Sequence, residues 1–61
     1  MTLQELTIKK PGFIDILNQA TKYRNSKIKD IIYSELKKKL DFYTPEEYGT
    51  AIQYITEALD Y

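Results

Sequence analysis

The sequence predicts an all-α fold: a small three-helix bundle with a short N-terminal helical or extended arm. Three observations predict it. Apolar residues recur at three- and four-residue steps in three segments, cap-forming residues precede two of these segments, and the links between the segments are short. Short links favour antiparallel neighbours, so a bundle is the simplest packing. We divide the single domain of residues 1–61 into an arm at 1–10 and helices at about 11–24, 26–42 and 44–60.

The last helix has the clearest predicted start. Thr44 is expected at the N-cap and Pro45 at the first helical position, with Glu47 two positions further on. In this capping box the Thr44 hydroxyl and the Glu47 carboxylate each accept a bond from an otherwise unpaired backbone N–H, and Tyr43 and Tyr48 flank it as a hydrophobic staple. Beyond the box, one apolar face is formed by Tyr48, Ala51, Ile52, Ile55, Ala58 and Leu59.

The earlier helices and the arm follow from similar signals. Pro11 opens the first helix, Ser26 is the predicted N-cap of the second, and Asn25 between them suits the left-handed conformation that ends a helix. Two alternatives stay open for the arm, because residues 2–5 have the spacing of a capping box whereas Leu6-Thr7-Ile8-Lys9 alternates as a short strand does. The apolar stripes of the two helices are Phe13, Ile16, Leu17, Ala20 and Tyr23, and Ile28, Ile32, Leu36 and Leu40.

Composition excludes several function classes. The chain has no Cys and no His, which removes disulfides, Cys/His zinc sites, thiol nucleophiles and an imidazole base. No catalytic triad, phosphate loop or metal-ligand spacing is present, so we expect no enzyme activity, no metal, no cofactor and no small-molecule substrate. Without a long apolar run or a signal peptide, we expect a cytoplasmic protein with no membrane partner. Abundant Ile, Lys and Tyr, whose codons are AT-rich, indicate a low-GC bacterium or a mobile element.

Charge is unevenly distributed although the formal net charge is zero. Residues 1–43 contain all nine basic residues and five acidic ones, whereas residues 44–61 contain four acidic residues and no basic one. The simplest interpretation is that folding brings the acidic helix against the basic ones. An alternative is an inhibitor, encoded by a mobile element, that presents the acidic helix to a basic host target.

One basic cluster surrounds the link before the middle helix. It consists of Lys22, Arg24, Lys27 and Lys29, with Ser26 among them as a further phosphate-binding candidate. Cations in a first helical turn oppose the helix dipole, whereas an anion bound at the exposed N–H groups would favour them. The cluster therefore suggests an alternative function, a dimeric DNA-binding regulator that contacts phosphates here. The competing interpretation is an ordinary solvated basic surface without a ligand.

Two parts of this sequence resemble the ribbon-helix-helix repressors. Leu6-Thr7-Ile8-Lys9 looks like their short strand, and the Ser26-Lys27 pair is similar to the pair that opens their second helix. The resemblance implies a dimer whose strand contacts bases and whose Ser26 and Lys27 hold a phosphate. The chain departs from the family at Glu5, which would face phosphates, and at Pro11-Gly12, which follow the strand too soon.

Tyrosine is unusually frequent, with six residues in sixty-one. On the last helix, Tyr54 and Tyr61 lie beside Ala51 and Ala58, outside the centre of the apolar face. Small residues permit close approach of another chain, and tyrosine offers a large contact area with a polar tip. The main functional prediction is a small non-catalytic protein-binding or regulatory module that uses this edge of the last helix, as a homo-oligomer or with a partner protein.

Overall fold

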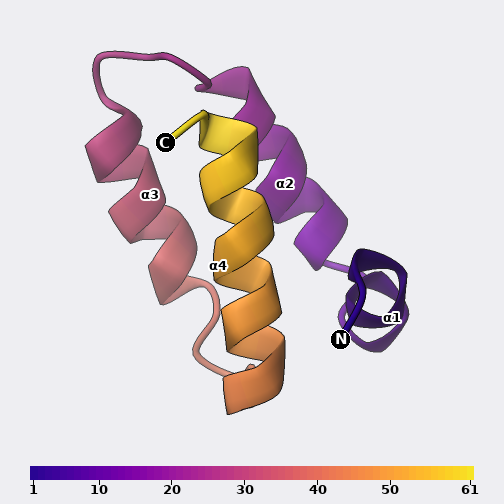
Figure 1. The fold of residues 1–61 in the computed structure, drawn as a ribbon. Helices are drawn as coiled ribbons and strands as arrows, with labels where there is room; N and C mark the ends of the chain where they lie inside the picture. The colour runs from indigo at the N-terminus through magenta and orange to yellow at the C-terminus, as the bar shows by residue number, and fades with distance from the viewer.

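The computed structural model describes residues 1–61 as four helices joined by turns, with no strand (Figure 1). The prediction of an all-helical fold is confirmed. None of the helices combines the length and the apolar composition that crossing a bilayer requires. The helices are α1 (Leu3–Lys9), α2 (Phe13–Lys22), α3 (Lys29–Lys38) and α4 (Pro45–Leu59).

The central element is α4, which packs against each of the other three helices. In Figure 1, α2 and α3 lie on either side of α4, and α1 lies beside the end of the molecule where α2 begins. The chain runs up α2, down α3 and up α4 in this view, so α3 is antiparallel to both of its neighbours. The short links predicted this antiparallel arrangement of consecutive helices.

The core consists of nine buried apolar side chains, contributed by all four helices and by the link that follows α3. The apolar stripes predicted for α2, α3 and α4 supply most of them. At one end of the core, the Tyr43 ring packs edge-on against Phe13, with 6.3 Å between the ring centroids. The largest fully buried side chains are Phe13, Leu6, Leu36, Ile55 and Leu59.

The N-terminal arm is helical. The Thr2 hydroxyl accepts a hydrogen bond from the Glu5 backbone N–H at 3.1 Å, which caps α1, and Leu6 is fully buried in the core. Lys10, the residue before Pro11, leaves the helical conformation and ends α1. The helical alternative for the arm is therefore confirmed and the strand alternative is wrong. A bundle of three helices with an arm is not confirmed, because α1 packs as a fourth helix against α2 and α4.

The first two predicted helices are shorter than expected. α2 covers Phe13–Lys22 against the predicted 11–24, with Pro11 in the turn before it, and α3 covers Lys29–Lys38 against 26–42. Asn25 has a positive φ of 61°, in the left-handed conformation expected of it. The Ser26 hydroxyl accepts a bond from the Ile28 N–H at 3.2 Å, and the Ser26 carbonyl accepts one from the Lys29 N–H at 3.3 Å. Because these short-range bonds hold residues 26–28 in turns, the regular helix begins only at Lys29. The prediction of Ser26 as the N-cap is therefore wrong, because Ile28 occupies that position and no side chain caps α3.

The start of α4 agrees with the prediction. The Thr44 hydroxyl accepts a bond from the Glu47 N–H at 3.2 Å, and the Glu47 carboxylate accepts one from the Thr44 N–H at 2.9 Å. Hydrogen bonding to the Thr44 backbone is the main cause that lowers the pKa of Glu47, with the positive charges of Lys10 and Lys9 as smaller causes. The capping box therefore depends on an ionised Glu47 beside the lysines that end α1.

Candidate functional site

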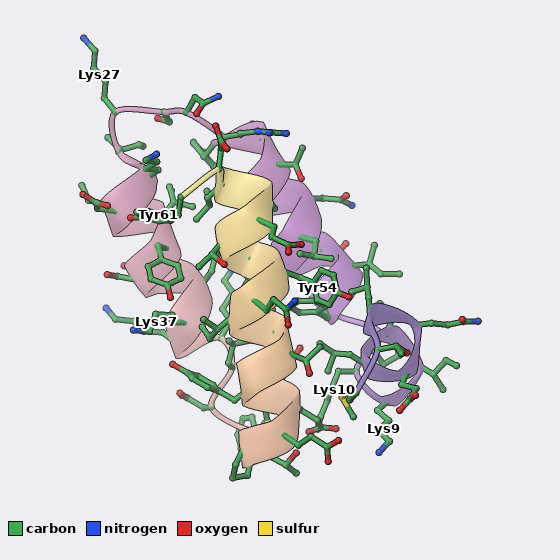
Figure 2. The ribbon with its side chains drawn as sticks, viewed as in Figure 1. Lys9, Lys10, Lys27, Lys37, Tyr54 and Tyr61 are labelled. Atoms are coloured by element: carbon green, nitrogen blue, oxygen red, sulfur yellow. The ribbon has the colours of Figure 1, made fainter.

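The predicted interface on the last helix is not one exposed edge. Ala51 is fully buried, and Tyr54 and Ala58 are half-buried against the core. Figure 2 shows Tyr54 on the side of α4 that faces α2, whereas Tyr61 lies on the side that faces α3. The physical reason is the packing of α1 and α2 against α4, which covers part of the face that periodicity alone left outside the core.

Tyr61 is occupied by contacts within the chain. Its hydroxyl donates a hydrogen bond to the Asp30 carboxylate, and its ring centroid lies 5.2 Å from that of Tyr33. The Lys29 ammonium lies over the same ring, 4.9 Å from the centroid. The bond to Asp30 is the main cause that raises the pKa of Tyr61 to about 12. We call the contacts of Asp60 and Tyr61 with α3 and with the link before it the C-terminal clasp.

The predicted phosphate-binding cluster is divided by the C-terminal clasp. Arg24 forms an ion pair with the Asp60 carboxylate at 3.8 Å, and the Lys29 ammonium donates to the Asp60 carbonyl at 3.3 Å. Lys22 lies over the Tyr23 ring, 5.8 Å from its centroid. Lys27 extends alone into solvent at one end of the molecule (Figure 2).

Two further features weaken an anion site at the start of α3. The Ser26 hydroxyl already accepts the Ile28 N–H, and Asp30 places a carboxylate in the first turn of the helix. An anion bound here would meet that carboxylate. The structure therefore brings Lys22, Arg24, Ser26, Lys27 and Lys29 to one end of the molecule without converging them on one point.

A different surface has the geometry of a binding site. A groove of about 440 Å³ opens where the α1–α2 corner meets the side of α2 and the link between α3 and α4. Its volume falls within the range typical of pockets that bind ligands. Three lysines line it together with one carboxylate and an apolar strip. These lining residues include Lys9, Lys10, Asp15, Ile16, Lys39 and Phe42.

The three lysines of this groove share one property. None of their ammonium groups is in an ion pair with a carboxylate of the chain. Lys10 donates to the Phe42 carbonyl at 3.3 Å and lies over the Tyr43 ring, 5.5 Å from its centroid. Lys39 donates to the Gln19 side-chain oxygen at 2.9 Å. Because an ammonium group has three N–H donors, each of these positioned lysines retains donors for a ligand.

Phe42 is the most exposed apolar side chain of the groove. Its residue surface is 90% exposed, the highest value among the large apolar residues of the chain. α3 has already ended at Lys38, and Leu40 in the same link turns into the core while Phe42 does not. An exposed phenyl ring beside a groove offers a large apolar contact area to a partner.

Sequence reasoning missed this groove, because its parts lie far apart in the chain. Lys10 and Phe42, which are joined by a hydrogen bond, are 32 positions apart. The one signal present in the sequence is Phe42 itself, which falls outside the four-residue spacing of Ile28, Ile32, Leu36 and Leu40. An aromatic residue outside the apolar stripe and close to a run of lysines marks such a surface.

The acidic residues form no second site. No three acidic side chains converge in an arrangement that could hold a metal ion. Asp60 pairs with Arg24, and Glu47 is held in the capping box. Comparison with protein-family models, with curated proteins and with solved structures found no match.

Proposed function

We propose that the protein is a small non-catalytic binding module that recognises a partner protein through the groove between α2, the α1–α2 corner and the α3–α4 link. The observation that carries the proposal is the 90% exposed Phe42 beside a groove of about 440 Å³. A ring left in water at the edge of a concave surface gains most from being covered by another molecule. The class of function is the one that the sequence predicts, but the binding surface is the groove and not the edge of α4.

DNA binding through the basic link has less support. Arg24 and Lys29 are engaged by Asp60, so an anion would have to compete with contacts inside the chain. The groove has an apolar ring and a carboxylate among its lysines, and a mixture of apolar and charged groups is typical of protein interfaces. A partner protein is therefore the ligand class that the groove favours.

The test is selection of binders from a random peptide library displayed on phage, with the immobilised chain as bait. Wild-type chain should enrich peptides that lose binding to Phe42→Ala. Ile31→Ala is the matched control, because Ile31 is also exposed, at 61%, and lies on α3 outside the groove. Both variants change exposed side chains and should keep the wild-type helical circular dichroism.

Two outcomes would overturn the proposal. The first is the absence of any enriched peptide. The second is enrichment of peptides that bind Phe42→Ala as tightly as the wild type. Molar mass by light scattering across a concentration series, run in parallel on both variants, detects a second copy of the chain as the occupant, since Phe42→Ala would then dissociate a wild-type dimer and Ile31→Ala would not.

A further inference from the structure

We infer that the occupant of the groove is an acidic peptide segment in which carboxylates flank one large apolar side chain. This inference rests on the proposed function and deepens it by stating the chemistry of the partner. Its basis is the combination, within one groove, of three lysines outside any ion pair and an exposed phenyl ring.

The groove carries an excess of positive charge. Of the basic side chains outside the groove, Arg24 and Lys38 are in ion pairs, with Asp60 and Glu35, and the other four lysines are in none. The groove differs from the rest of the surface because it gathers three lysines in one concave site. In the groove, Lys9, Lys10 and Lys39 outnumber the single lining carboxylate of Asp15, and Asp15 pairs with none of them. The charges of Lys9 and Lys10 also act on Glu47, but that carboxylate is not in the lining and is bonded in the capping box. A ligand with carboxylates would supply the missing opposite charge, and complementary charge gives an interface both specificity and fast association.

Two of the groove lysines are positioned by hydrogen bonds within the chain. Lys10 is fixed by the Phe42 carbonyl and Lys39 by Gln19, so these ammonium groups lie on the rim before a ligand arrives. A side chain that is already ordered loses less entropy on binding. Lys10 also places a positive charge close to the exposed ring, because its ammonium group donates a hydrogen bond to the carbonyl of Phe42. Carboxylates of the ligand should therefore lie within a few residues of its apolar side chain.

The lining of the groove favours a peptide over a nucleic acid. Asp15 lies in the groove among the lysines. A phosphate backbone carries charge at every nucleotide and would bring one of these charges near Asp15, whereas a peptide can place a neutral residue there. Single-stranded nucleic acid also stacks successive bases on several aromatic rings, and Phe42 is the one strongly exposed ring in this groove.

The experiment starts from the peptides that wild-type chain enriches and that depend on Phe42. Their sequences should contain Asp or Glu on both sides of an aromatic or large aliphatic residue, in excess over the unselected library. Binding of one such fluorescent peptide is then measured by anisotropy. Exchange of its acids for the corresponding amides should weaken binding at least tenfold at low salt, and by less at 0.5 M salt, because ions screen exposed pairs.

Two double variants of the chain test whether the lysines of the groove are the ones that bind the peptide. The double variant Lys9→Gln with Lys39→Gln should weaken peptide binding about tenfold, because each lost ion pair between an exposed lysine and a peptide carboxylate reduces affinity about threefold. Lys22→Gln with Lys27→Gln removes the same two charges outside the groove and should leave affinity within about twofold, since the screening length at physiological salt is about 8 Å. A mixed-sequence single-stranded oligonucleotide of equal length serves as the competing ligand.

The outcomes separate the inference from the proposed function. Peptides that depend on Phe42 but bind equally well as amides would overturn the acidic occupant and leave the protein-binding module intact. If the oligonucleotide displaces the peptide and binds more tightly than it, the occupant of the groove is a nucleic acid and the inference of an acidic peptide is wrong. The absence of any Phe42-dependent peptide would overturn both.

Discussion

Replacement of Leu6 by alanine tests whether α1 is part of the fold. The Leu6 side chain is fully buried although it lies on a helix of only seven residues. Leu→Ala removes three carbon groups at about 0.8 kcal/mol each, and the cavity left behind adds a further cost. We therefore expect the free energy of unfolding to fall by about 3 kcal/mol. A domain of this length has a total stability of roughly 3–9 kcal/mol, so the loss is a large part of the whole.

The assay is urea denaturation followed by helical circular dichroism, with wild type and variants at one protein concentration. Ile8→Ala is the matched control, because Ile8 lies on the same helix and is 72% exposed. That control should stay within about 0.5 kcal/mol of wild type. A Leu6→Ala protein as stable as Ile8→Ala would refute the reasoning, since α1 would then contribute nothing to the core.

Three further predictions concern the two ends of α4. Thr44→Ala should lower the free energy of unfolding by about 1 kcal/mol in the same assay, because the N-cap hydroxyl is lost; no change would contradict the capping box. Glu47 has a folded-state pKa below its ordinary value of 4.5. Its ionised carboxylate therefore contributes to the free energy of unfolding above pH 4.5, and this contribution is lost as the pH falls through the folded-state pKa. The acid-induced loss of stability below about pH 4.5 should be smaller in Glu47→Gln, as urea titrations at several pH values would show. Tyr61 has a pKa raised from 10.0 to about 12, so its contribution is present below pH 10 and lost as the pH rises toward 12. Ultraviolet titration of the tyrosine hydroxyls should detect one group with a pKa of about 12, and this group should be absent in Tyr61→Phe. In Asp30→Asn its pKa should move toward 10, and an unchanged titration curve in that variant would exclude the hydrogen bond to Asp30.

Local signals in the sequence predicted the helices well, because caps and apolar spacing act over a few residues. The Thr44 capping box and the left-handed Asn25 are both found, and the core uses most of the predicted stripes. The arm stayed ambiguous because its alternation and its cap spacing predict different structures. Burial of Leu6 decides between them, and that burial depends on α4 far along the chain.

The binding surface could not be predicted in the same way. Ala51 and Tyr54 were expected at an exposed edge because periodicity cannot show which helices cover α4. The basic cluster is clear in the sequence, yet its partner Asp60 lies at the other end of the chain. Lys10 meets Phe42 only once the helices are assembled. A surface built from distant residues requires the fold before it can be recognised.

The central position of α4 has a consequence for how the chain is made. The ribosome synthesises α4 after the other three helices, and α1, α2 and α3 all pack against it. Even the Thr50 hydroxyl donates a hydrogen bond to the Met1 carbonyl, across 49 positions of sequence. The first three helices therefore leave the exit tunnel with their apolar faces uncovered, and this domain cannot fold until α4 has emerged. A ribosome-bound chain stalled before α4 emerges should be digested readily by protease, while the released protein resists.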